Sequence, residues 1–242
     1  MSTIITAIDH HSPAERAGIQ VGEKLLSING HSIVDVLDYL FYGYDPVSHI
    51  ELKTPSGDVR TVTLHKAEGQ DLGLNFDTYL MDEMRSCANH CVFCFVDQMP
   101  PGMRQTLYFK DDDARLSFLL GNYITLTNLT EREAQRIIDL HICPINVSVH
   151  TTDPQLHCTM LGNKNAGRSL DYIKAFCEAG IVMNGQIVVC PGWNDGDQLR
   201  RTLRDLTDWQ FSSCSIVPVG ITKYRQGLAK LRPVDSECAR SI

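Results

Sequence analysis

Three of the nine cysteines lie close together as Cys87, Cys91 and Cys94, in the segment SCANHCVFCF. Three thiolates on one short loop can hold a metal centre on one side of that loop. A structural zinc ion needs four ligands, so His90 or a remote cysteine would have to complete such a site. A [4Fe-4S] cluster on three cysteines leaves one iron open for chemistry. The spacing therefore predicts an iron–sulfur cluster or a zinc site.

The other six cysteines are scattered singly along the chain. An odd number of cysteines cannot pair completely within one chain, and the N-terminus lacks the basic start and apolar core of a signal peptide. We therefore expect a cytoplasmic protein without a disulfide framework. We expect the six to pack as small apolar side chains: Cys143, Cys158, Cys177, Cys190, Cys214 and Cys238.

The composition is that of a globular protein in water, with 43% hydrophobic and 21% charged residues in a chain of 242. No apolar run is long enough to cross a membrane as a helix. The net charge of −7 argues against a nucleic-acid partner, which would select a basic surface. Neither a membrane nor a nucleic acid is expected as a partner.

The elements that must position the cysteines belong to residues 70–242, where strands and helices alternate. Strands that alternate with helices of 10 to 13 residues form parallel sheets, so we expect an α/β domain. The pattern predicts strands at 121–128, 145–150, 182–190 and 213–219, separated by helices at 130–140, 167–179 and 197–209.

One face of three predicted strands is polar, which is unusual for a sheet covered by helices on both sides. A partial (β/α) barrel with a polar interior would explain this, with its ligand at the C-terminal ends of the strands. The candidate ligand contacts are Thr127, Asn128, Ser148, His150 and Gln186. For each of them taken singly, the alternative is a hydrogen bond within the core.

Two further charged groups, the carboxylates at 111–113 and Arg168, have a functional interpretation and an alternative in which they are only solvated surface groups. The carboxylates of Asp111, Asp112 and Asp113 would suit a divalent cation, but three consecutive carboxylates are more typical of a solvated turn, which we predict. Arg168 would suit a carboxylate ligand, but we predict a solvated arginine at the start of a helix.

Residues 1–69 predict a separate, small β-rich domain. Asn29-Gly30 is typical of a hairpin turn, and alternating residues at 50–54 and 59–64 predict a second hairpin. A strand is expected at 24–28 and a helix at 34–41.

Four short segments of this domain, SPA at 12–14, AG at 17–18, VGE at 21–23 and ING at 28–30, resemble a PDZ domain of the bacterial protease type. The resemblance implies capture of the C-terminus of a peptide or protein as an added strand. Its carboxylate would meet the amides of residues 72–76, which resemble the carboxylate-binding loop of a permuted PDZ domain. The alternative for these five residues is a linker strand into the next domain. The alternative is a docking module that binds no free peptide.

The cysteine spacing, with Phe93 before the last cysteine and strand–helix repeats behind it, resembles the radical S-adenosylmethionine (SAM) superfamily. The segments SVHTTDP and GQIVVCPGWNDG extend the resemblance to one family, with a PDZ-like module, a radical SAM core and a C-terminal domain of unknown function. The resemblance covers essentially the whole chain and implies an enzyme. Its substrate is unidentified, and a protein or peptide is one candidate class.

The resemblance also implies the cofactors. Cys87, Cys91 and Cys94 would each bind one iron of a [4Fe-4S] cluster, and SAM would chelate the fourth. One electron from flavodoxin or ferredoxin would cleave SAM to methionine and a 5′-deoxyadenosyl radical that takes a hydrogen atom from the substrate. The cofactor carries this chemistry, while the protein positions it.

The site residues implied for SAM lie at the predicted strand ends. Thr127 and Asn128 would lie near the amino group of SAM, and the backbone of residues 215–220 near its adenine. Ser148, His150 and Gln186 would reach the ribose or the carboxylate. Phe93 and Phe95 would shield the cluster.

The core domain shows no more than five of the usual six or so βα units. We therefore expect this domain to be incomplete at its C-terminus. If the missing unit is essential for activity, this chain is an inactive fragment. The alternative function is a non-catalytic zinc-binding adaptor whose PDZ-like head recruits a peptide. The absence of a Gly-Gly-Glu motif after the first strand favours this alternative. Metal content separates the two, because the enzyme would hold about four irons and the adaptor one zinc.

Overall fold

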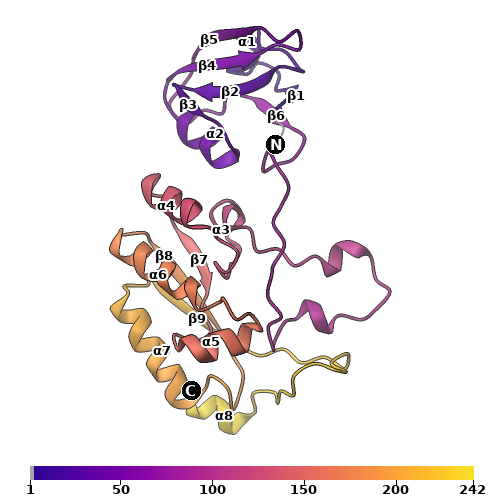
Figure 1. Ribbon diagram of the computed structural model, residues 1–242, viewed down its shortest axis with the longest axis vertical. Coiled ribbons are helices and arrows are strands. Elements are labelled where there is room, and N and C mark those ends of the chain that lie inside the picture. The colour runs from indigo at the N-terminus through magenta and orange to yellow at the C-terminus, as the bar shows by residue number, and fades with distance from the viewer. Residues whose placement is uncertain (1–2) are drawn as a thin grey trace. The chain divides into compact units, whose positions relative to one another are not determined.

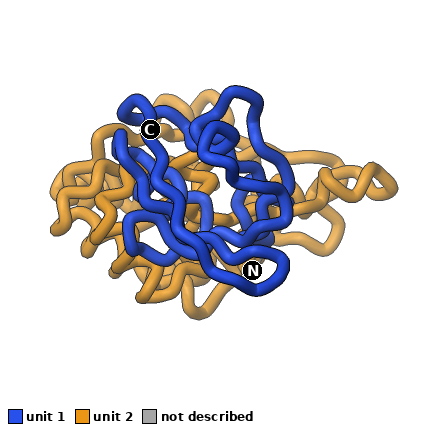
Figure 2. The backbone as a smooth tube through the Cα atoms, turned by 90° about the horizontal axis from the view of Figure 1, so that it is seen from above, with its two compact units in different colours: residues 1–84 blue, residues 85–242 orange. Residues whose placement is uncertain are grey.

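The computed structural model describes residues 3–242, which divide between Met84 and Arg85 into two compact units, unit 1 and unit 2 (Figure 2). Unit 1 is β-rich, as predicted, and unit 2 mixes helices and strands (Figure 1). No helix among the described residues combines the length and the apolar character needed to span a membrane.

Unit 1 contains a four-stranded sheet in the order β3-β2-β4-β5 and a two-stranded sheet of β1 and β6. Its core side chains, among them Ile5, Leu25, Ile50 and Leu52, are at most 1% exposed. The elements are β1 (Ile5–Ile8), α1 (Pro13–Arg16), β2 (Lys24–Ile28), β3 (His31–Ser32), α2 (Val36–Tyr42), β4 (Val47–Lys53), β5 (Val59–His65) and β6 (Leu74–Phe76).

Local signals explain most of unit 1. Asn29 and Gly30 both have positive φ and join β2 to β3 as a two-residue hairpin, as predicted. The Ser12 hydroxyl accepts a hydrogen bond from the Glu15 amide and caps α1. The unit extends to Met84 rather than to the expected boundary after residue 69, because β6 pairs with β1.

Unit 2 contains a parallel three-stranded sheet in the order β7-β8-β9, with α6 and α7 packed beside it (Figure 1). The remaining elements are short. The helices and strands are η1 (Val96–Gln98), η2 (Gln105–Tyr108), α3 (Ala114–Leu120), α4 (Glu131–Asp139), β7 (Ile145–Ser148), α5 (Pro154–Leu161), α6 (Arg168–Glu178), β8 (Met183–Val189), α7 (Gly196–Asp208), β9 (Ser213–Pro218) and α8 (Ser236–Ser241).

The strand predicted at 121–128 is wrong. This segment makes only one isolated parallel bridge, between Ile124 and Val147. The backbone leaves the extended conformation at Leu126, which has φ of 60°. The Thr125 amide donates to the Asp112 carboxylate rather than to the carbonyl of a neighbouring strand. With three strands in the described sheet, the predicted partial barrel is not confirmed.

The predicted alternation of polar and apolar faces is present. In β7 and β8, every second residue is buried and the polar residues between them are half-buried. Asn184 donates to Asn146 at 3.0 Å and accepts from the Ser213 hydroxyl at 2.7 Å, so this part of the polar face satisfies itself. On this face of β7 and β8, polar side chains without such a partner remain only at Ser148 and Gln186, which lie closer to the C-terminal ends of the strands.

Candidate metal and cofactor site

The cysteine loop, residues 87–94, is fixed to the end of α5. The His90 amide donates to the Leu161 carbonyl and the Val92 amide to the Met160 carbonyl, both at 2.8 Å. Gly162 allows this close approach, because a Cβ there would lie 2.4 Å from the His90 carbonyl oxygen. The loop is therefore held by backbone contacts that do not depend on its cysteines.

The same loop packs against the C-terminal ends of the parallel strands. Val92 and Phe93 contact a buried cluster of Met160, Cys190 and Val219, the last two of which directly follow β8 and β9. Parallel sheets of α/β proteins place their ligand sites at this edge. The fold thus brings the cysteines to the location where the polar strand ends also lie.

Two side chains from neighbouring segments reinforce the loop. The Gln98 side chain donates to the carbonyl of Gly220 at 2.9 Å and to that of Cys94 at 3.3 Å. Arg225 donates to the Val92 carbonyl at 2.9 Å. The exposed Phe95 ring lies beside Gly220, where an added Cβ would be 3.4 Å from it.

The three thiols are half-buried and none forms a disulfide. Burial raises the pKa of Cys87, while hydrogen bonds from Asn89 oppose this effect. Burial, followed by the charges of Cys87 and Cys94, raises the pKa of Cys91.

This donor set fits an iron–sulfur cluster. Among residues 3–242, no three His, Cys, Asp or Glu side chains surround a point where a single metal ion could bind. A cluster makes a different demand, since each cysteine binds a separate iron atom. Three unpaired thiols on one anchored loop are the residues that would hold it.

A hydrogen-bond network connects the loop to the segment after α3. Asn89, which is 2% exposed, donates from Nδ2 to the hydroxyls of Thr125 and Thr127 at 2.9 and 2.8 Å. Its Oδ1 accepts from Thr127 at 3.1 Å and from Asn163 at 2.8 Å. The predicted SAM contact Thr127 thus lies next to the cysteine loop.

The prediction of a solvated turn at residues 111–113 is wrong for two of the three carboxylates. Asp112 and Asp113 are 2% and 1% exposed. Asp112 accepts from the amide and hydroxyl of Thr125 at 2.7 and 2.5 Å, and Asp113 pairs with Arg115 at 2.6 Å. Burial raises the pKa of Asp112 to about 6.

The other predicted SAM contacts have different surroundings. Ser148 and Gln186 are half-buried neighbours in the β7–β8 register, and neither side chain has a hydrogen bond within the described part of the chain. Asn128 donates to the carbonyls of Ser86 and Asp112 at 3.3 and 3.0 Å. Ser148 and Gln186 are therefore the predicted contacts best able to accept a new partner.

His150 lies between the loop and the sheet. It is 3% exposed, its ring is 4.4 Å from that of Phe93, and its Nδ1 accepts from the Val188 amide at 3.1 Å. Burial, with a smaller effect of His157, lowers the pKa of His150 to about 3. The neutral His150 ring therefore packs against Phe93 of the cysteine loop.

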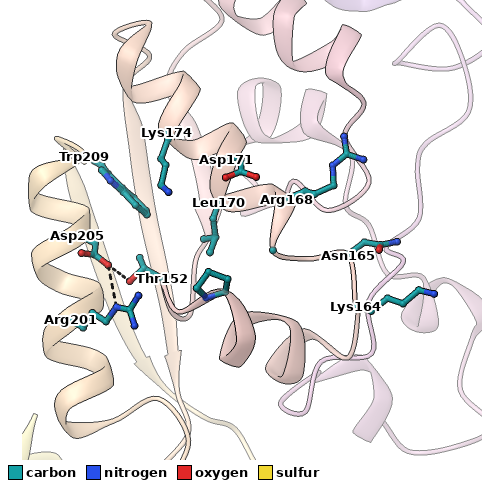
Figure 3. Close-up of a pocket in the computed structure, with 12 residues that line it drawn as sticks. Thr152, Lys164, Asn165, Arg168, Leu170, Asp171, Lys174, Arg201, Asp205 and Trp209 are labelled. Atoms are coloured by element: carbon teal, nitrogen blue, oxygen red, sulfur yellow. Dashed lines mark hydrogen bonds and ion pairs between the residues drawn. The ribbon is translucent and has the colours of Figure 1, made fainter.

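A cleft of about 620 Å³ lies elsewhere in unit 2, between α5, α6 and α7 (Figure 3). On one wall Asp205 accepts from Thr152 and pairs with Arg201, and Lys174 lies 5.7 Å from the Trp209 ring centroid. No cysteine and no predicted SAM contact lines it. The cleft is a feature separate from the cysteine loop.

Arg168 lines the same cleft, and its side chain is 64% exposed. It pairs with Glu131 at 2.9 Å. The prediction of a solvated arginine at the start of a helix is confirmed.

Two amides of the predicted carboxylate-binding loop of unit 1 already have partners within the unit. The Gly73 amide donates to Asp71 Oδ1 at 2.6 Å, and the Leu74 amide to the Tyr39 hydroxyl at 3.3 Å. Leu72 and Leu74 are 1% and 5% exposed. These residues are part of the core of unit 1 rather than an open loop.

Sequence reasoning missed Asn89 and Asn163 as site residues, and it missed the burial of Asp112 and its hydrogen bonds with Thr125. Asn89 had one available signal, its position between two predicted ligands. The others come from distant segments, and nothing local to them indicates that they meet.

Comparison with known families gives two matches. Residues 66–216 match the radical SAM-like domain, and residues 4–53 match the PDZ domain. A comparison with curated proteins gives no match.

Among solved structures, the chain is similar to a radical SAM methyltransferase from Sphaerobacter thermophilus, with 13% identity and a TM-score of 0.38. The similarity covers 94% of this chain and 74% of that one. It is too distant to bear on strand arrangement or reaction. The family match alone spans more than half of the 242 residues, and the chain therefore belongs to the radical SAM-like domain family.

Proposed function

We propose that the chain is a radical SAM enzyme whose cysteine loop holds a [4Fe-4S] cluster. The observation that carries this proposal is the anchored loop of three unpaired thiols at the C-terminal edge of the parallel sheet. When bound, the cluster and SAM together supply reductive cleavage of SAM and the start of radical chemistry.

The chain's own residues have three tasks in this proposal. Cys87, Cys91 and Cys94 bind iron, and the loop's apolar residues Val92 and Phe93 exclude water from the sheet side. Ser148 and Gln186 offer unused polar groups to SAM. Thr127 is held close to the loop by Asn89 and offers a further contact.

The proposal includes a flavodoxin-like or ferredoxin-like electron donor and a cytoplasmic location. The substrate is not assigned. Recruitment of a peptide C-terminus through residues 72–76 is not part of it, because the amides of Gly73 and Leu74 already have partners within unit 1. An enzyme acting on a peptide would need another recognition surface.

The test is anaerobic reconstitution with iron and sulfide, reduction with dithionite, and quantification of SAM cleavage by mass spectrometry. The proposal predicts equal amounts of methionine and 5′-deoxyadenosine, and none from a Cys94→Ala variant. Full iron loading without cleavage of SAM would refute the proposal that the chain is a radical SAM enzyme. Stoichiometric zinc in place of iron would support the adaptor instead.

A further inference from the structure

Cys87 differs from the other two cysteines of the loop in its hydrogen bonds. The backbone amide and the Nδ2 of Asn89 both donate to the Cys87 sulfur, each at 3.4 Å. Within residues 3–242, the sulfurs of Cys91 and Cys94 accept no hydrogen bond. The loop therefore presents one thiol with two donors and two thiols with none.

The orientation of the Asn89 amide is determined by its other partners. The Thr125 hydroxyl donates to Asp112, so its oxygen is left to accept from Asn89 Nδ2. On the opposite side, Asn163 Nδ2 donates to Asn89 Oδ1 at 2.8 Å. With its oxygen engaged by donors, the Asn89 side chain presents the two hydrogens of its NH2 group to the Cys87 sulfur and to the hydroxyls of Thr125 and Thr127.

Hydrogen bonds to a cysteine sulfur affect the reduction potential of a cluster. A donor directed at a thiolate stabilises negative charge, and the reduced cluster carries one more negative charge than the oxidised one. The two bonds from Asn89 therefore favour reduction. Since Asn89 is buried, water cannot replace its side-chain bond without a rearrangement of the network.

We propose that Asn89 is a positioning residue that orients Cys87 and raises the reduction potential of the cluster bound there. This inference rests on the proposed function, because it needs a cluster on these cysteines. It assigns Asn89, together with Thr125 and Asp112 that orient its amide, to redox control of the site. It also makes Cys87 the ligand through which the segment after α3 acts on the iron.

The experiment compares the reconstituted full chain with three variants in an anaerobic redox titration followed by electron paramagnetic resonance. Asn89→Ala removes the side-chain donor to sulfur, and Asn89→Asp keeps the shape but adds a negative charge. Asn163→Ala is the matched control, because it removes a bond of the same network without touching sulfur. Iron and sulfide content is measured for each.

The expected result is a more negative midpoint potential for Asn89→Ala, a still more negative one for Asn89→Asp, and the wild-type value for Asn163→Ala. A purely structural role for Asn89 would not move the potential of a fully loaded cluster. Unchanged midpoints in both loaded Asn89 variants would overturn the inference. It would also be overturned if neither Asn89 variant held a cluster that Asn163→Ala holds, since the effect would then be one of assembly. Failure of the wild-type chain to bind iron would instead refute the proposed function, and this inference with it.

Discussion

The loop at residues 71–76 of unit 1 and the cysteine loop at residues 87–94 of unit 2 differ in how the chain uses their polar groups. In unit 1, Asp71 and Tyr39 already bind the amides of Gly73 and Leu74, in the loop that resembles a carboxylate-binding loop. In unit 2, the backbone is fixed by α5, while the thiols stay unpaired. The cysteine loop therefore keeps three thiols outside any disulfide, whereas two amides of the unit 1 loop are already bound within the unit.

Removal of one thiol gives the largest expected effect. Cys91→Ala should reduce the iron content from about four atoms per chain to nearly none, since two cysteines cannot hold the cluster. Cys177→Ala, on α6, is the control and should bind as much iron as the wild type. Full loading of Cys91→Ala would show that the loop is not the iron site.

Acidification should affect the two units differently. His150 and His157 of unit 2 are buried, and burial lowers their pKa values to about 3 and about 4. The unfolded state then binds more protons, so stability falls as the pH drops below about 6.5, by up to about 1.4 kcal/mol per pH unit for each histidine. Asp112, with its pKa raised to about 6, opposes part of this loss.

All five histidines of unit 1 are exposed, namely His10, His11, His31, His49 and His65. Denaturant unfolding at pH 7 and pH 5 should therefore shift the transition of unit 2 more than that of unit 1. Equal shifts would contradict the assignment of two neutral, buried histidines to unit 2.

The contact between α5 and the cysteine loop can be broken at Gly162. Gly162→Ala would place a Cβ 2.4 Å from the His90 carbonyl oxygen at φ of 59°, and should cost about 2–3 kcal/mol and reduce iron retention. Gly180→Ala has φ of 72° but open space around it, so only the backbone cost of about 1 kcal/mol is expected. Equal effects of the two changes on iron retention would disprove the role of this contact.

The corresponding change in unit 1 should affect stability alone. Gly73→Ala would bring a Cβ within 2.2 Å of the Ser12 Cβ at φ of 85°, with an expected cost of about 2 kcal/mol. Gly30→Ala, with φ of 81° and no neighbouring atom, is the matched control. Neither variant should alter the iron content, and a loss of iron in Gly73→Ala would contradict the independence of the two loops.

Elements with strong local signals were predictable. The strand at 24–28, the Asn29-Gly30 turn and the helix predicted at 130–140, which is α4, follow from short-range rules and are confirmed. The strand at 121–128 failed because a buried carboxylate from another segment, Asp112, takes the Thr125 amide. Periodicity within one segment does not reveal such competition.

In the candidate site, too, local features were predictable and long-range contacts were not. The three cysteines are close in sequence, so their grouping needed no knowledge of the fold. Asn89 meets Thr125, Thr127 and Asn163 only after α3, α5 and the loop have packed, and burial of Asp112 depends on the same packing. Contacts of long sequence separation determine the surroundings of the thiols.

The most direct test of the central claim is electron paramagnetic resonance of the anaerobically reconstituted, dithionite-reduced chain, recorded with and without SAM. We expect a reduced [4Fe-4S] signal that changes when SAM is added, because three cysteines leave one iron open for SAM. A cluster signal unaffected by SAM, or no iron signal together with stoichiometric zinc, would contradict it.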